Sequence, residues 1–235
     1  MIEAHYEQHY FEWQRKVGVL SAEIILPLFQ QHVAEDHRCV DFGCGGGYLL
    51  EKIHCTQKIG VEINEVAVRV AEEKGLKVVK DLESIPDQWA DVIISNHALE
   101  HVLHPADVLA TMYRKLKPGG KLVLRVPHEV YAPYNAGDPN KHLYTWSPMN
   151  IGNLTTALGF RLLHTREERI VFPPKFQAVY RIFGKTGFNA IAWLYSRLFH
   201  RWYARLVWQY PVVAWNVLCV AQKPHEPTTD PRTPA

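Results

Sequence analysis

A chain of 235 residues is long enough for one sizeable domain, and 47% hydrophobic with 21% charged residues is typical of a globular protein. A net charge of +2 does not indicate a nucleic-acid-binding protein. Four cysteines without a C-x-x-C pair, and a start without a basic-then-apolar leader, argue against a secreted disulfide framework and predict a cytoplasmic location.

The first segment of the chain has a helical pattern. Apolar residues recur at helical spacing between residues 3 and 33, with an interruption at Pro27. We therefore expect N-terminal helices that form a cap, residues 1–35, ahead of the first strand.

The central segment, residues 36–168, alternates short apolar runs with amphipathic patterns. The expected strands are 38–42, 58–61, 91–95, 121–126 and 160–166, and the expected helices are 48–53, 65–74, 105–116 and 149–158. Strands that alternate with helices at this spacing predict βαβ units around a parallel sheet. The connection from Pro127 to Pro148 is too long for a plain turn, so we expect it to be functional or disordered.

The segment 169–210 is aromatic and basic. From Ile170 to His225 there are seven basic residues and no acidic one, which leaves 19 basic against 24 acidic residues elsewhere in the chain. We expect a helical insertion here, a last strand within residues 211–223, and a disordered Pro/Thr-rich tail, 224–235. Residues 1–223 would then form one domain.

The most informative motif lies between the first expected strand and its helix and reads Asp41-Phe42-Gly43-Cys44-Gly45-Gly46-Gly47. Glycines let a backbone approach a ligand closely, and ligands of open α/β sheets bind at the carboxyl ends of strands. A dinucleotide site requires G-x-G-x-x-G, but residue 48 is Tyr, which disfavours a nicotinamide dehydrogenase. Asp41 suits a cationic ligand better than a pyrophosphate. Glu62 ends the second expected strand, where a carboxylate can accept hydrogen bonds from both hydroxyls of a ribose.

Five motifs in order resemble those of the class I S-adenosylmethionine (SAM)-dependent methyltransferases. Asp41–Gly47 is similar to their glycine loop and Glu62 to their ribose-binding acid. The other three resemble the motif after the third strand, the fourth-strand motif and the turn before the fifth strand, and they are the runs 80–82, 94–102 and 116–122. Residues 7–15 are similar to the aromatic cap of a subgroup that acts on small molecules, glycans and lipids.

The resemblance implies a doubly wound, mostly parallel seven-stranded α/β sheet and SAM as the cofactor. In this family the glycine loop holds the methionine portion, and an acid in the position of Asp81 contacts the adenine amine. The cofactor-binding residues that the resemblance implies are Asp41, Gly43, Cys44, Gly45, Glu62, Ile63, Asp81, Leu82, Asn96 and His97.

Two histidines are the candidates for a catalytic base, because imidazole titrates near neutral pH. His101 follows the fourth expected strand, and His142 lies in the long loop that we expect to cover the site. His101 could instead cap the turn before Pro105, and His142 could organise its loop. A metal site is not predicted. His97, His101 and His104 have helical spacing, but Pro105 fits the first turn of the next helix, and no cysteine or carboxylate partner is evident at ligand spacing.

The pattern within residues 188–208 is a wide apolar arc with Arg197, Arg201 and Arg205 on one helical face. Three arginines exclude a normal transmembrane span. Three interpretations remain: a helix packed on the sheet or on a second subunit of a homodimer, an interfacial membrane helix, and a lid whose arginines face an anionic substrate. The short stripe and the low net charge disfavour nucleic acid as a partner.

The sequence thus predicts a cytoplasmic SAM-dependent methyltransferase, with peripheral contact at the inner membrane face through residues 176–210 as an open alternative. The expected acceptor is a small molecule, a glycan or a lipid-linked compound, and O-methylation is the first choice. The alternative function is a SAM-binding protein without turnover.

Overall fold

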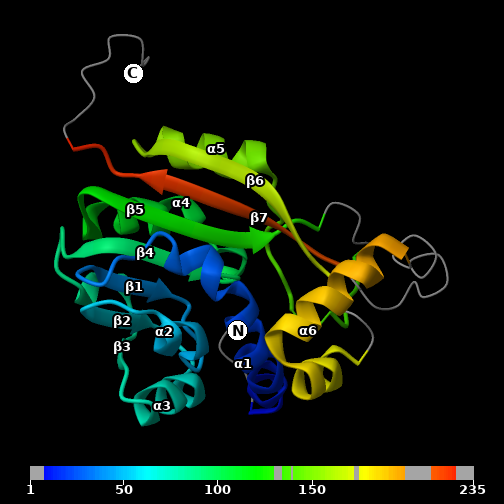
Figure 1. The fold of residues 1–235 in the computed structure, drawn as a ribbon. Helices are drawn as coiled ribbons and strands as arrows, with labels where there is room; N and C mark the ends of the chain where they lie inside the picture. Colours follow the sequence, from blue (N-terminus) through cyan, green and yellow to red (C-terminus); the bar gives the residue numbers. More distant parts are fainter. Residues whose placement is uncertain (1–7, 130–133, 139, 172–174, 199–212, 226–235) are drawn as a thin grey trace.

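The protein, seen in a computed structural model that describes residues 8–129, 134–138, 140–171, 175–198 and 213–225, is built on one mixed sheet (Figure 1). Its seven strands have the order β3-β2-β1-β4-β5-β7-β6. All pairs from β3 to β5 are parallel, whereas β7 pairs antiparallel with both β5 and β6. The predicted fold class, a doubly wound and mostly parallel seven-stranded sheet, is confirmed.

The elements of the described chain follow one another as strand and helix over most of its length. The strands are β1 Arg38–Phe42, β2 Gln57–Val61, β3 Lys77–Val79, β4 Ala90–Asn96, β5 Leu116–Pro127, β6 Arg161–Val171 and β7 Val213–Gln222. The helices are α1 Gln8–Gln30, α2 Tyr48–Lys52, α3 Glu65–Glu73, α4 Pro105–Lys115, α5 Pro148–Ala157 and α6 Phe176–Leu198, with short 3₁₀ turns at η2 Leu82–Ser84 and η3 Leu99–His101.

The amino-terminal segment differs from the prediction, because α1 is one helix that continues through Pro27. A proline inside a helix removes one backbone hydrogen bond. The fully buried Ile25 and Phe29 flank it, and their burial against the sheet offsets that cost.

Both faces of the sheet are buried, which explains the uninterrupted apolar run of β4. Val92 and Ile94 belong to one core cluster with Ile25 and Phe29 of α1, whereas Ile93 belongs to the other. The cluster that contains Ile93 also holds residues of α4 and α5, among them Leu109, Met112 and Ile151. Figure 1 shows α1 and α3 on one side of the sheet and α4 and α5 on the other.

The chain reverses its winding direction between β1 and β4. The strands β2 and β3 lie on one side of β1, and β5, β7 and β6 lie beyond β4. In open α/β sheets the crevice at such a reversal binds ligands at the carboxyl ends of the strands. Two loops border this crevice, the glycine loop after β1 and the turn η3 after β4.

The predicted helical insertion before the last strand is represented by α6, which Figure 1 shows lying beyond the tip of β5. Its backbone departs from helical geometry at Gly184, with φ 64° and ψ −172°. Arg201 and Arg205 of the predicted arginine stripe lie outside the described residues. None of the helices in the described residues is long and apolar enough to span a membrane.

Candidate active site

The glycine loop is held against the end of β2 by its own backbone. The N–H groups of Gly43 and Cys44 donate to the carbonyl oxygen of Val61 at 2.9 and 3.2 Å. Gly43 has a φ of +72°, and a Cβ there would lie 2.3 Å from the Cβ of Ala98, so a side chain cannot be accommodated. Gly45 also has a positive φ (+52°), but a Cβ there would meet no protein atom within 4 Å. The loop therefore leaves open space at Gly45.

Glu62 connects this loop to the segment after β2. Its Oε2 accepts a hydrogen bond from the N–H of Gly45 at 2.9 Å, and its Oε1 accepts from those of Ile63 and Asn64 at 2.9 and 2.8 Å. The carboxylate thus lies beside the glycine loop at the end of β2, the position expected of a ribose-binding acid. The ribose contact itself stays a prediction.

Asp41 lies beneath the loop and is only 2% exposed. Burial, followed by the nearby charge of Glu62, raises the pKa of the Asp41 carboxyl to about 7. A cationic group bound close by would favour the charged form of this carboxyl and lower that pKa. The Asp41 carboxylate would therefore stabilise a sulfonium or ammonium ligand bound in this part of the site.

Cys44 and Leu82 contribute packing. The Cys44 thiol is buried against β2, since a Cβ at Gly60 would lie 2.5 Å from its Sγ. The side chain of Leu82 belongs to the core. Asp81, just before it, is exposed and accepts hydrogen bonds from the N–H and hydroxyl of Ser84 at 2.8 and 2.7 Å, so it caps η2. Its predicted adenine contact stays a prediction.

Asn96 is the last residue of β4 and His97 follows it, and protein contacts already occupy parts of both side chains. The Oδ1 of Asn96 accepts from Arg125 Nη1 at 3.0 Å, and Arg125 Nε donates to Glu168 at 2.8 Å. The Nδ1 of His97 lies 3.2 Å from Oε1 of Glu100. The structure thus places both residues at the crevice, and their cofactor contacts stay predictions.

The two candidate catalytic histidines come together. The rings of His101, in η3, and His142 meet edge to face with centroids 4.9 Å apart. The loop that carries His142 is attached to this turn, because Leu143 N–H donates to the carbonyl of Glu100 at 2.9 Å, and the Tyr144 hydroxyl donates to the carbonyl of Leu103 at 2.8 Å. Both histidines therefore lie at the carboxyl end of β4.

Their surroundings separate the two histidines electrostatically. Burial lowers the pKa of His101, so its imidazole is neutral at pH 7. Burial opposes charge on His142 as well, but its hydrogen bond from Nδ1 to Glu129 at 2.9 Å and the charge of Glu100 together raise its pKa. One imidazole is thereby suited to accept a proton and the other to carry one.

Sequence reasoning missed the two carboxylates of this cluster, Glu100 and Glu129. Glu100 is fully buried although it is charged, and it adjoins His101 in the chain. An acid within the fourth-strand motif, residues 94–102, was a signal for Glu100. No sequence signal places Glu129 against His142.

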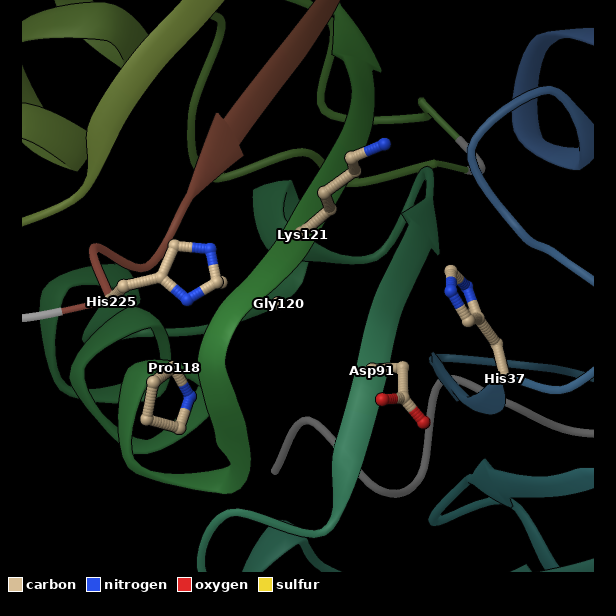
Figure 2. A pocket seen from close by; sticks show the side chains of 7 residues that line it. His37, Asp91, Pro118, Gly120, Lys121 and His225 are labelled. Carbon is tan, nitrogen blue, oxygen red and sulfur yellow. The ribbon is translucent and has the colours of Figure 1, made fainter.

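A separate hollow of about 230 Å³ lies at the other end of the sheet, and Figure 2 shows His37, Asp91, Lys121 and His225 around it. His37 precedes β1 and Asp91 is near the start of β4, so the hollow is at the amino ends of these strands. Asp91 is already paired with Lys117. The hollow thus lies at the opposite end of the sheet from the glycine loop and is separate from the crevice described above.

A family described as "Methyltransferase domain" has a model that matches residues 11–165. A ubiquinone biosynthesis O-methyltransferase of Pseudomonas savastanoi is 34% identical over 98 residues, which are 36% of this chain and 42% of the relative. The alignment thus spans less than half of the relative's length.

Two solved structures share the fold. A SAM-dependent methyltransferase from Thermotoga maritima has a TM-score of 0.63 at 18% identity and covers 94% of this chain and 98% of its own. One from Archaeoglobus fulgidus has a TM-score of 0.61 at 21% identity and covers 92% of this chain and 100% of its own.

Proposed function

We propose that this chain, which belongs to the SAM-dependent class I methyltransferases, transfers a methyl group from SAM to an oxygen of a small-molecule, glycan or lipid-linked acceptor. The observation that carries the proposal is a juxtaposition: the glycine loop and Glu62 flank the same crevice as the His101–His142 pair. The relative named as an O-methyltransferase supports oxygen as the methylated atom.

For the cofactor, the proposed contacts are the ten residues that the family resemblance implies. The open space at Gly45 and the carboxylate of Glu62 would hold the methionine portion and the ribose. Asp41 would supply negative charge beneath the loop. Bound SAM contributes a methyl group on a sulfonium, which already carries a good leaving group.

For the acceptor, we assign the two histidines different tasks. Neutral His101 takes the proton of the acceptor hydroxyl, because burial lowers its pKa and keeps the imidazole in its basic form at pH 7. Burial opposes charge on His142, but its contact with Glu129 and the charge of Glu100 raise its pKa and favour the protonated ring, which would stabilise the negative charge that develops on the acceptor oxygen. The loop attached to η3 would limit the access of water to this end of the crevice.

Calorimetric titration with SAM, S-adenosylhomocysteine and NAD, followed by transfer of labelled methyl groups into a cell extract, tests the proposal. SAM and S-adenosylhomocysteine should bind and NAD should not. Label should appear in an acceptor with the wild type and with His104→Ala, an exposed histidine in the next turn, and should fall steeply with His101→Ala. SAM binding with no transfer to any fraction would favour a SAM-binding protein without turnover.

We further propose that α6 docks the enzyme on an anionic membrane. Four large apolar side chains of α6 are exposed, namely Ile182, Phe183, Trp193 and Leu194. Its exposed charges are all basic, Arg181, Lys185 and Arg197, and Arg197 lies 4.8 Å from the ring centre of Trp193. Apolar and aromatic groups beside cations are typical of interfacial helices, and each basic group contributes about 1 kcal/mol near an anionic surface.

Liposome co-sedimentation tests this docking. The wild type should pellet with vesicles that contain phosphatidylglycerol and not with neutral phosphatidylcholine vesicles, and salt should release it. The triple variant Arg181→Gln, Lys185→Gln, Arg197→Gln should stay in the supernatant, whereas Arg161→Gln on β6 serves as a matched control. Equal behaviour of wild type and triple variant would refute membrane docking, and a dimer in sedimentation analysis would then assign α6 to a subunit contact.

A further inference from the structure

Three side chains at the acceptor end of the crevice have the composition of a metal site. One oxygen of Glu100 and one ring nitrogen each of His101 and His142 all lie within 4.8 Å of one another. We propose that these three residues bind one divalent transition-metal ion of the Zn²⁺ or Co²⁺ class.

Glu100 is a buried acid with few partners. Its side chain is 0% exposed, its Oε2 has no hydrogen-bond partner within the described structure, and its Oε1 faces only imidazole nitrogens there. The nearest groups are His97 Nδ1 at 3.2 Å and His142 Nε2 at 3.8 Å, both facing Oε1. Burying a carboxylate is costly unless it is paired or coordinates a metal. A cation between Glu100 and the histidines would remove that cost.

The ring of His142 is oriented by Glu129. Its Nδ1 lies 2.9 Å from Glu129 Oε2. A carboxylate can only accept, so Nδ1 carries the hydrogen, and the lone pair of the neutral ring is on Nε2, the nitrogen nearer to Glu100. Metal-binding histidines are commonly oriented in this way, by a carboxylate on the nitrogen that does not bind the ion.

The turn η3 and the loop that carries His142 are attached to each other. Glu100 and His101 are consecutive residues of η3, and the loop that carries His142 is tied to the same turn by the hydrogen bond from Leu143 N–H to the carbonyl of Glu100. The three ligand atoms are thus supported from two segments. Metal–ligand distances near 2.0–2.2 Å would require the atoms to move closer, by rotation of the two half-buried imidazoles.

The donor set decides the class of ion. Two imidazoles and one carboxylate suit zinc and its neighbours in the first transition row, whereas magnesium and calcium favour oxygen ligands. Three protein ligands also leave a coordination position open, as catalytic metal sites do. The sequence showed no carboxylate at metal-ligand spacing. In the structure, Glu100 supplies that carboxylate.

The inference rests on the proposed function for the place of the acceptor, and it deepens that function. An acceptor hydroxyl on the open position would release its proton to solvent water more readily, because a bound divalent ion lowers the pKa of a coordinated hydroxyl. His101 would then be a metal ligand and not the base, and His142 a neutral ligand and not a cation. The two roles exclude each other in one molecule, so a metal titration decides between them.

The test uses the full chain without any histidine tag, stripped with a chelator and titrated with Co²⁺ and then Zn²⁺. We expect one Co²⁺ per chain with visible absorption, displaced by Zn²⁺, and no binding in the double variant His101→Ala, His142→Ala. Glu129→Gln should weaken binding roughly 10- to 100-fold, since it alters only the support of His142. His104→Ala is the matched control, and SAM affinity and circular dichroism report whether each variant is folded.

Absence of the cobalt spectrum in the wild type, or binding that persists in the double variant, would overturn the metal site. Chelator-resistant methyl transfer by metal-free enzyme would also overturn it, and would leave the proposed methyltransferase function standing. An ion bound at this site in a protein that transfers no methyl group would support the metal site and contradict the proposed methyltransferase function. The two proposals therefore fail separately.

Discussion

Replacing Glu62 by alanine removes three hydrogen bonds at once, those from the N–H groups of Gly45, Ile63 and Asn64 at 2.8–2.9 Å. A buried hydrogen bond to a charged group contributes about 1.5–3 kcal/mol. Because Glu62 is half-exposed, water replaces part of each bond, and we expect the free energy of unfolding to fall by about 1–3 kcal/mol in total. Loss of the ribose contact should weaken SAM binding roughly 10- to 100-fold.

Calorimetric titration with SAM measures the affinity, and urea denaturation measures the stability. Glu65→Ala is the control, because within the described part of the chain the Glu65 carboxylate pairs with exposed Arg69 and Lys80 at 3.8 and 3.4 Å. That variant should change the free energy of unfolding by less than about 0.5 kcal/mol. If Glu62→Ala lowers stability but binds SAM as the wild type does, Glu62 only supports the glycine loop, and the assignment of the ribose contact is wrong.

Three further predictions follow from the same site. Gly45→Val should abolish SAM binding with unchanged circular dichroism, since its side chain fills the open space; an affinity retained within a few-fold would exclude the loop from the site. Because the pKa of Asp41 is raised from 3.8 to about 7, the folded empty protein binds a proton that the unfolded chain does not, so stability should fall as pH rises through this window. Asp41→Asn should flatten that pH profile, and calorimetry in two buffers should show that SAM binding releases a proton only in the wild type. His101→Ala should slow turnover about 10²-fold or more with unchanged SAM affinity, and normal turnover would show that His101 does not handle the proton.

The parts of the fold that the sequence predicted well have strong local signals. Pro105 sits at the first turn of α4, and the apolar run of β4 is buried on both faces of the sheet. The order of glycines in Asp41–Gly47 and the place of Glu62 are properties of one βαβ unit, β1 to β2, so they could be read locally. The strand β3 gave no such signal, because its three residues are exposed or half-buried at the sheet edge.

The cluster around His101 and His142 depends on contacts between distant segments, and the sequence predicted it only in part. His101 and His142 were recognised as single residues, but their meeting depends on how the loop after β5 folds back onto η3. Glu100 and Glu129 lie next to His142 because that loop folds back onto η3. Asp81 shows the converse, since its cap of η2 is a local contact that a family motif does not reveal.

The most direct test of the account is transfer of a ¹³C-labelled methyl group from SAM into acceptors of a cell extract, with the product examined by NMR. We predict a methoxy signal in one extracted compound, formed together with S-adenosylhomocysteine and lost with His101→Ala. A methyl group on nitrogen or carbon would contradict oxygen as the target. SAM bound at the crevice without transfer to any compound would contradict the enzyme itself.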